Sequence, residues 1–388
     1  MTDIISVIAP INMAVIKYWG KRDEKLIIPL NDSVSGTLDP KVMCAKTSVC
    51  ARSAFEEDVL WLNGIKESIT SERLQNCLKK IRELAVEQKS VDEEFLKFKV
   101  HICSENNFPT AAGLASSAAG YACLVTALAT LYKVKTDISA LARIGSGSAC
   151  RSVYGGFVRW YAGSNPDGSD SIAKPVVDSS HWPDMRVLVL VIADTKKHTS
   201  STKGMKTTVE TSELMKHRIQ VSVPSRIEKL CEAIVKKDFP TFAELTMKDS
   251  NEFHAVCLSA FPPCVYLTNT SLKIIEMVHY YNNICGTIKV AYTFDAGPNA
   301  CLYLLEEEVP KILSVIKYFF PFSSEDFIKG LKAPPIKEFP IESHIYKSAT
   351  EKDLINYIIY TKVGEGPIVL KDGPHLLNEH GKPHEKKI

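Results

Sequence analysis

The pattern of hydrophobic and polar positions in the first half of the chain predicts strands that alternate with helices. Alternation of apolar and polar residues is typical of half-buried strands, whereas apolar residues three and four positions apart are typical of helices. The Asn63-Gly64 pair is a favoured two-residue hairpin turn. On these grounds we predict strands at residues 4–9, 42–51, 58–62, 95–103, 157–161 and 186–193, and helices at 70–87, 121–132 and 136–143.

In the second half, helical spacing dominates from about residue 205. It predicts helices at residues 205–218, 224–236, 239–255 and 271–281. Shorter apolar runs predict strands at 288–292, 300–305 and 357–362. The residues that follow the last strand are polar and rich in lysine, which is typical of a loosely held tail.

A strand-rich first half and a helix-rich second half predict an α+β fold of two closely packed lobes. We place the N-terminal lobe at residues 1–195, the helix-rich C-terminal lobe at 196–370 and the tail at 371–388. The active site is expected in the cleft between the lobes.

Composition narrows the function classes. The formal net charge of +2 gives no case for binding nucleic acid or an anionic membrane, so anion binding must depend on local positive charge. No apolar run approaches the ~18 residues of a membrane-spanning helix, and the N-terminus lacks the basic and apolar regions of a secretory signal. Eleven scattered cysteines without a C-x-x-C pair indicate reduced thiols and a cytoplasmic protein, rather than disulfides or a zinc site.

A loop of very small residues at 106–120 joins a predicted strand to a predicted helix. Small side chains let a ligand approach main-chain N–H groups, and the helix dipole favours an anion at the helix start. Ser116 or Ser117 could cap that helix. The loop is therefore a candidate phosphate-binding site, although it matches neither the P-loop nor the dinucleotide pattern. A tightly packed helix start without a ligand would give the same pattern.

Lys17 lies between Ile16 and the Tyr18-Trp19 pair, which are apolar or aromatic. A cation held among such groups is costly unless an anion pairs with it. A charged surface turn would explain the neighbouring Lys21 and Arg22, but it explains Lys17 less well. We therefore expect an anionic ligand at this segment.

Four further polar sites, the segment at residues 145–151 and three single residues, have both a functional and a local interpretation. Residues 145–151 bring two serines and Arg151 to a helix start, which suits phosphate or carboxylate. A capped turn would account for the serines but not for Arg151. Simple capping would account for Thr202, and a solvated helix surface for Arg73. Asp295 lies in a tight turn, where an Asp is commonly a local hydrogen-bonding residue.

Four motifs together carry a family resemblance. The loop P-x-x-x-G-L-x-S-S-A-A at 109–119 resembles the ATP-phosphate loop of the galactokinase, homoserine kinase, mevalonate kinase and phosphomevalonate kinase superfamily. The complete sequence of residues 106–120, N-N-F-P-T-A-A-G-L-A-S-S-A-A-G, is similar to that of one branch of this superfamily, the mevalonate diphosphate decarboxylases. Residues 9–23 (A-P-I-N to K-Y-W-G-K-R-D), 145–152 (G-S-G-S-A-C-R-S) and 292–299 (Y-T-F-D-A-G-P-N) match the same branch, in family order and across nearly the whole chain.

The resemblance implies a fold and a reaction. The fold would be the two-lobed small-molecule-kinase fold, with an N-terminal lobe like ribosomal protein S5 domain 2 and a ferredoxin-like C-terminal lobe. The reaction would convert ATP and (R)-mevalonate 5-diphosphate to isopentenyl diphosphate, ADP, phosphate and carbon dioxide, in the mevalonate pathway of isoprenoid and sterol biosynthesis. ATP with Mg²⁺ would be required, and family members imply a homodimer.

The resemblance also implies roles for individual residues. Asp295 would accept or orient the proton of the tertiary alcohol, and Lys17 would neutralise charge near the transferred phosphoryl group. Arg151 would hold the substrate carboxylate, and Asn12 would fix Arg151 by a hydrogen bond. Substrate binding is assigned to Tyr18, Trp19, Gly20, Lys21, Arg73, Ser146, Gly147, Ser148, Ala149, Cys150, Arg151 and Thr202. ATP binding is assigned to Pro109, Ala111, Ala112, Gly113, Leu114, Ala115, Ser116, catalytic Ser117 and Ala118, and no side chain is assigned as a metal ligand.

Two alternative functions stay open at this point. A kinase of the same superfamily would leave the phosphorylated alcohol intact. Many such kinases carry P-S-G-x-D near the segment where this chain has G-S-G-S-A-C-R, and their Asp is the base. Arg151 in this segment favours a decarboxylase, which must orient a carboxylate. A non-catalytic ligand sensor on the same fold would not need to keep Lys17 and Asp295.

Overall fold

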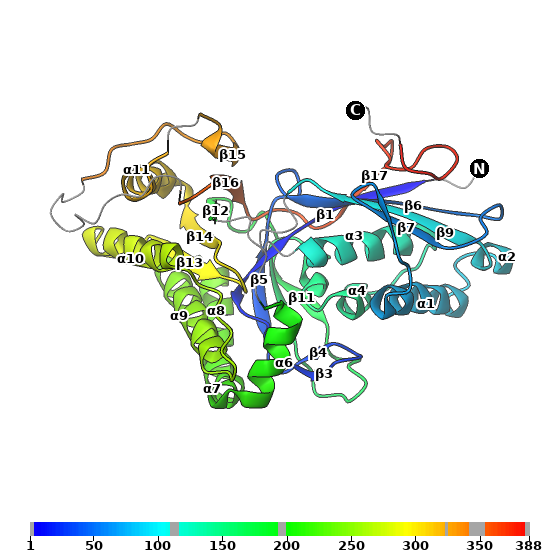
Figure 1. Ribbon diagram of the computed structural model, residues 1–388, viewed down its shortest axis with the longest axis horizontal. Coiled ribbons are helices and arrows are strands. Elements are labelled where there is room, and N and C mark those ends of the chain that lie inside the picture. Colours follow the sequence, from blue (N-terminus) through cyan, green and yellow to red (C-terminus); the bar gives the residue numbers. More distant parts are fainter. Residues whose placement is uncertain (1–3, 109–115, 193–198, 323–324, 341–353, 385–388) are drawn as a thin grey trace.

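The first lobe is a six-stranded sheet covered by helices. The computed structural model describes residues 4–108, 116–192, 199–322, 325–340 and 354–384 (Figure 1). The strand order is β17-β1-β6-β9-β7-β8, and α3 packs on β1 and β6, with α1 and α4 beyond it. The elements of this lobe are β1 (Ile5–Pro10), β6 (Cys44–Arg52), β7 (Val59–Leu62), β8 (Ile65–Glu67), α1 (Glu72–Glu87), α2 (Glu93–Leu96), β9 (Lys99–Asn106), α3 (Ser116–Leu131), α4 (Ser139–Gly145), α5 (Ala149–Ser152) and β17 (Ile368–Leu370).

A second sheet, of order β11-β10-β5-β2, lies between the two lobes. Every residue of β2 and β5 is buried, because both faces of these strands are covered. The elements here are β2 (Asn12–Ile16), the hairpin of β3 (Lys21–Asp23) and β4 (Ile28–Pro29), β5 (Ser33–Thr37), β10 (Phe157–Trp160) and β11 (Ala173–Val177).

The helix-rich lobe is built around a five-stranded sheet of order β13-β14-β12-β16-β15. Its helices α9 and α10 pack on β13, and α9 also contacts β2 (Figure 1). The elements are β12 (Met185–Val191), α6 (Ser201–Thr211), α7 (Glu213–His217), the π-helix η1 (Arg218–Ser222), α8 (Val223–Lys236), α9 (Phe239–Leu258), α10 (Asn269–Ile284), β13 (Val290–Phe294), β14 (Ala300–Leu305), the 3₁₀ turns η2 (Glu306–Glu308) and η3 (Glu325–Phe327), α11 (Val309–Phe319), β15 (Ile328–Gly330) and β16 (Tyr357–Lys362).

One continuous hydrophobic core joins the lobes. The ring of Phe242 on α9 lies 5.6 Å from Phe157 of β10 and 5.6 Å from Tyr303 of β14. The Tyr303 hydroxyl donates a hydrogen bond of 2.9 Å to the carbonyl of Met13 in β2. The close packing of two lobes that the sequence predicts is therefore confirmed, and it holds β2 rigidly against β13 and β14. Among the described helices, none is long and apolar enough to cross a bilayer.

Most predicted elements are present; two elements and the predicted lobe boundary differ for identifiable reasons. The strand predicted from residue 95 begins at Lys99, because residues 93–96 form the short helix α2. The helix predicted at 205–218 is interrupted at Ser212, whose main chain is extended with φ −89° and ψ 114°. The predicted lobe boundary at 195/196 also differs, because β12 occupies the centre of the C-terminal sheet.

The C-terminal segment is the clearest correction. Strand β17 pairs antiparallel with β1. Beyond it, Leu377 is buried against Cys50 and Cys103, and the main-chain N–H of Leu376 donates to the Ser48 hydroxyl at 2.8 Å. The prediction of a loosely held tail is therefore wrong for residues 371–384, because one buried leucine and main-chain hydrogen bonds anchor a segment whose composition is polar.

Candidate active site between the lobes

The centre of the candidate site is a contact between the lobes. Lys17, just after β2, and Asp295, just after β13, meet with Nζ to Oδ1 at 2.6 Å. The Lys17 ammonium also donates to the carbonyl of Ala14 at 2.8 Å. The Lys17 side chain is 3% exposed, whereas that of Asp295 is 29% exposed, so the carboxylate is reachable from the solvent side. A partly exposed carboxylate can exchange a proton with a bound ligand, and a buried ammonium beside it can stabilise negative charge that develops there.

Arg151 on α5 is the second element of the site. It is 2% exposed, and its hydrogen bonds go to neutral oxygens: Asn12 Oδ1 at 3.2 and 3.3 Å, Ser35 Oγ at 2.9 Å, and Ser33 Oγ. Burial lowers its pKa, which the charge of Asp295 partly offsets. Within the described residues no carboxylate forms an ion pair with it. A buried guanidinium without such a partner is a favourable site for an anionic ligand.

Asn12 fixes the orientation of this guanidinium. Its amide group donates to the Ser148 carbonyl at 3.0 Å and to the Ser152 hydroxyl at 2.7 Å, which leaves the amide oxygen to accept from Arg151. The predicted Asn12–Arg151 hydrogen bond is therefore present.

Tyr18 lies against the turn at residues 145–148. A Cβ atom at position 147 would lie 2.9 Å from the tyrosine ring, so Gly147 is required for this approach. The Tyr18 hydroxyl is buried and has no hydrogen-bond partner in the described part of the chain. Burial, followed by the charge of Glu24, raises the pKa of Tyr18, and the charge of Arg73 acts in the opposite direction. The side chain of Lys21 is 3% exposed and contacts Glu24 at 2.5 Å.

The start of α3 approaches the same turn. The hydroxyls of Ser117 and Ser146 lie 3.3 Å apart, so the predicted ATP-binding and substrate-binding segments meet. Ala118, the next helical residue, is buried in the core. The predicted ATP-loop residues 109–115 lie outside the described residues.

Five other predicted substrate residues lie away from this cluster or pack in the interior. The indole N–H of Trp19 donates to Thr208 at 2.8 Å, and its ring packs on Phe253. Gly20 has φ +83°, and a Cβ there would lie 2.8 Å from Met215. Ala149 and Cys150 are fully buried, and burial raises the pKa of the Cys150 thiol to about 12. Thr202 is exposed on the first turn of α6.

Residues that the sequence analysis missed surround Lys17 and Asp295 from the C-terminal lobe. Asp249 and Arg218 bind the main chain of Lys17, and Ser250 binds the main chain of Phe294. His254 is buried nearby, and burial, followed by the charge of Lys17, lowers its pKa to about 3. One signal was present in the sequence: Asp249 falls on the same face of the helix as Phe242 and Phe253, where an apolar residue is expected.

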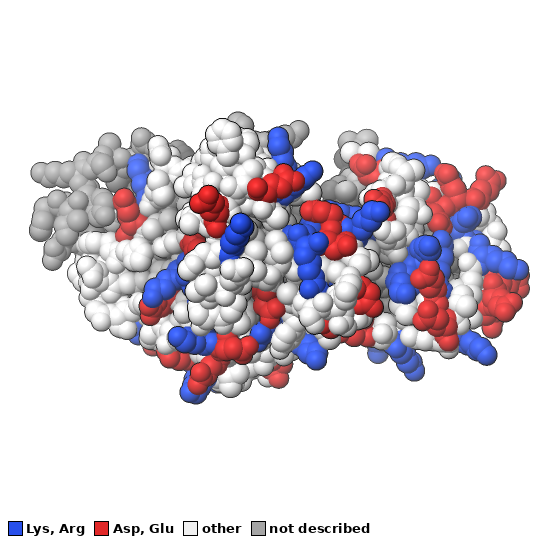
Figure 2. All heavy atoms as spheres, turned by 90° about the horizontal axis from the view of Figure 1, so that it is seen from below, with Lys and Arg blue, Asp and Glu red and all other residues white. Residues whose placement is uncertain are grey.

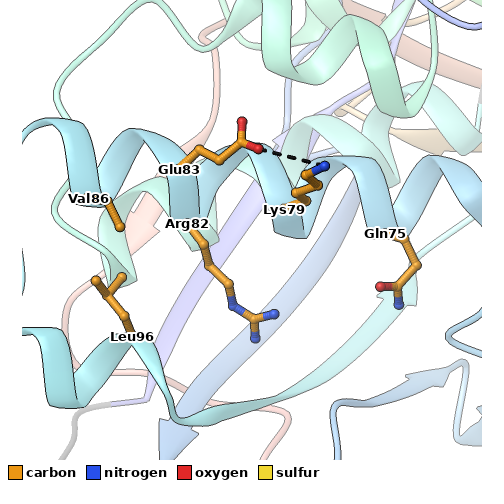
Figure 3. Close-up of a pocket in the computed structure, with 6 residues that line it drawn as sticks. All are labelled: Gln75, Lys79, Arg82, Glu83, Val86 and Leu96. Atoms are coloured by element: carbon orange, nitrogen blue, oxygen red, sulfur yellow. Dashed lines mark ion pairs between the residues drawn. The ribbon is translucent and has the colours of Figure 1, made fainter.

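On the face seen in Figure 2, Lys and Arg side chains lie among Asp and Glu side chains wherever charged residues are drawn, in agreement with the net charge of +2. A separate depression of about 450 Å³ lies beside helix α1, which also carries Arg73 (Figure 3). None of the residues that line it belongs to the candidate site. The charged side chains that line this depression form ion pairs, such as Arg82 with Asp58 at 3.0 Å. It is lined by Gln75, Lys79, Arg82, Glu83, Val86 and Leu96.

Comparisons with known proteins agree on one family. The model of the diphosphomevalonate decarboxylase-like N-terminal domain matches residues 9–173, and that of the mevalonate 5-diphosphate decarboxylase C-terminal domain matches residues 187–370. The diphosphomevalonate decarboxylase of Danio rerio is 48% identical, over 100% of this chain and 98% of that protein. A crystal structure of mevalonate 5-diphosphate decarboxylase is 46% identical, with a TM-score of 0.86, over 97% of this chain and 99% of that one. A complex of MDDEF with MVAPP, AMPPCP and magnesium is 30% identical, with a TM-score of 0.74, over 95% and 98% of the two chains.

Proposed function

This chain belongs to the diphosphomevalonate decarboxylase family, and from that premise we propose how its own residues perform the reaction. The chain catalyses the ATP-dependent conversion of (R)-mevalonate 5-diphosphate to isopentenyl diphosphate, ADP, phosphate and carbon dioxide, a step of the mevalonate pathway. The N-terminal lobe binds ATP and substrate in this proposal, and the C-terminal lobe supplies Asp295. The observation that carries the proposal is the Lys17–Asp295 contact of 2.6 Å, made across the lobes near the buried Arg151, which pairs with no carboxylate of the described residues.

Phosphoryl transfer comes first. The tertiary alcohol of the substrate is a poor leaving group, and phosphorylation makes it a good one. Asp295 accepts or orients the alcohol proton while the oxygen attacks the γ-phosphoryl group of ATP, and the Lys17 ammonium neutralises the charge that develops. The 2.6 Å contact supports this division of roles, because it places the carboxylate and the ammonium side by side at one point of the lobe interface.

Elimination follows. The C–O bond to the new phosphate breaks, and the bond between the neighbouring carbon and the carboxylate breaks with it. The electron pair of that C–C bond forms the double bond of isopentenyl diphosphate, while phosphate and carbon dioxide leave. Arg151 holds the carboxylate in line with the departing phosphate, and Asn12 fixes the guanidinium plane.

The diphosphate of the substrate is assigned to the turn at 145–148 and its neighbours. The buried Tyr18 hydroxyl, which lacks a partner in the described residues, would donate to a diphosphate oxygen. Ser146, Ser148, Lys21 and Arg73 add hydroxyl and cationic donors. We also keep Thr202 as a contact to the diphosphate, from the first turn of α6. Trp19, Gly20, Ala149 and Cys150 support the site by packing or through their main chain.

ATP is assigned to the 109–118 segment and the start of α3. Helix α3 has 16 residues, and the free main-chain N–H groups of its first turn can donate to phosphate oxygens. The Ser117 hydroxyl can donate to the same oxygens. The paired hydroxyls of Ser117 and Ser146 are hard oxygen donors of the kind that Mg²⁺ accepts beside phosphate, so the residues fit a magnesium–ATP complex. Magnesium, when bound, supplies neutralisation of phosphate charge. The complex of MDDEF with MVAPP, AMPPCP and magnesium supports the use of magnesium with ATP.

We further propose a homodimer that works in the cytoplasm. The dimer is what the family resemblance implies. The eleven free cysteines suit a reducing compartment. Light scattering on the purified protein should give a molar mass of twice 43.1 kDa. A mass of one chain at working concentrations would contradict the dimer without affecting the reaction.

The reaction itself has a direct test. Purified protein with ATP, Mg²⁺ and mevalonate 5-diphosphate should release carbon dioxide and phosphate in equal amounts, because both leave in one elimination. The two products should be followed together in the same sample, with omission of ATP as the control. A phosphorylated product that accumulates without carbon dioxide would instead support the kinase alternative.

A further inference from the structure

Side chains of the C-terminal lobe bind both peptide groups of Lys17. The Lys17 main-chain N–H donates to Asp249 Oδ2 at 2.8 Å. The Lys17 carbonyl accepts from Arg218 Nη2 at 3.0 Å and from the Asn31 amide at 3.1 Å. Lys17 follows β2 of the middle sheet, whereas Arg218 and Asp249 lie on η1 and α9 of the other lobe. The main chain of this lysine is therefore held from across the lobe interface.

Arg218 and Asp249 form a fully buried ion pair with both side chains 0% exposed. Two hydrogen bonds join them, Nη1 to Oδ1 at 2.8 Å and Nη2 to Oδ2 at 3.1 Å. A buried ion pair is a poor source of stability, because desolvation of the charges offsets their attraction. Arg218 also begins a π-helical turn, a rare conformation that is frequent at functional sites. Both features point to a role other than stability.

The position of Asp249 on α9 links it to the other catalytic residue. The next residue, Ser250, accepts a hydrogen bond of 3.1 Å from the main-chain N–H of Phe294, which directly precedes Asp295. Two consecutive residues of one helix thus hold the main chain of Lys17 and the main chain next to Asp295. Because a helix is rigid at this scale, the spacing between these two main-chain segments is set by α9.

We propose that Asp249, with Arg218 bound to it, is a positioning residue that holds the main chain of Lys17 so that its ammonium meets Asp295 and the transferred phosphoryl group. This proposal rests on the catalytic role assigned to Lys17 above. A lysine side chain is long and flexible, so its ammonium is placed only if its main chain is fixed. Displacement of a catalytic group by about 1 Å can cost roughly 10²-fold in rate. The pair acts through Lys17 and touches no substrate in this scheme.

The test uses two conservative variants and a matched control. Asp249→Asn keeps size but removes the charge and one of the two acceptor oxygens. Arg218→Lys keeps charge but cannot reach both Asp249 and the Lys17 carbonyl. Each should lower kcat by about tenfold or more and leave the KM of both substrates within about threefold.

The control is Glu252→Gln. Glu252 contacts Arg218 at 3.0 Å and Arg226 at 2.6 Å within the same ion network, but it contacts no atom of Lys17. The kcat of this variant should therefore stay near the parent value. Thermal unfolding of all variants establishes that each is folded.

A double-mutant cycle with Lys17→Ala separates positioning from general support. If Asp249 acts through Lys17, Asp249→Asn should add little to the loss already caused by Lys17→Ala. Losses that multiply, or a normal kcat in folded Asp249→Asn and Arg218→Lys, would overturn the proposal and leave the pair as a lobe-to-lobe contact. Full activity of Lys17→Ala would overturn the role of Lys17 itself, and that outcome is distinct from both.

Discussion

Arg151→Lys should lower kcat by about 10²-fold or more although the positive charge is retained. The guanidinium of Arg151 donates to three neutral partners, Asn12, Ser33 and Ser35. An ammonium on the shorter lysine side chain cannot hold those contacts and also bind a carboxylate through two oxygens. The carboxylate would then lose its alignment with the departing phosphate, so carbon dioxide release should fall in a steady-state assay.

The matched control is Arg159→Lys. Arg159 follows Arg151 closely in the chain and is also largely buried, but it pairs with Asp32 at 2.8 Å and Glu228 at 2.7 Å, and no site role is assigned to it. Its lysine variant should keep near-parent turnover. If Arg151→Lys also turned over at the parent rate, Arg151 would not be the residue that orients the carboxylate.

The fold was predictable where local pattern determines structure. Strands β14 and β16 have the bounds that their short apolar runs predict, and the Asn63-Gly64 turn has φ +52° and +85°, as a type I′ hairpin requires. The docking of residues 371–384 was not predictable, because it depends on contacts such as Leu377 with Cys50 that join distant parts of the chain. The composition of a segment does not indicate which distant residues of the same chain it packs against.

The site was predictable to the extent that its residues lie in motifs. Asn12 and Lys17 come from β2 and the residue after it, Asp295 follows β13, Arg151 lies on α5 and Ser117 on α3, and their catalytic roles stay predictions. The family resemblance assigns Trp19 to substrate binding, and in the structure its indole packs on Phe253 and donates to Thr208. Asp249 and Arg218 were missed, because their function depends on a main-chain contact across the lobes that no local motif encodes.

Asp295→Asn should lower kcat by ~10²-fold or more, the usual effect of losing a positioned general base. Asparagine keeps the size of the side chain and the tight turn, but its amide cannot accept the proton of the alcohol. It also leaves the buried Lys17 ammonium without its carboxylate at 2.6 Å. ATP affinity should change little, since its phosphates are assigned to the 109–118 segment. Carbon dioxide release and ATP binding, measured on the same preparation, test both parts.

The control for this variant is Asp58→Asn, which removes a different half-buried carboxylate from its arginine. Asp58 binds Arg82 at 3.0 Å and the Val100 main-chain N–H at 2.7 Å, away from the lobe interface. Its asparagine variant should lose some thermal stability and keep turnover, which separates loss of an ion pair from loss of the catalytic group. A large fall in the melting temperature of Asp295→Asn would instead show that Asp295 holds its own turn together. Parent activity in a well-folded Asp295→Asn protein would rule out Asp295 as the catalytic carboxylate, and phosphoryl transfer would then require another proton acceptor near Lys17.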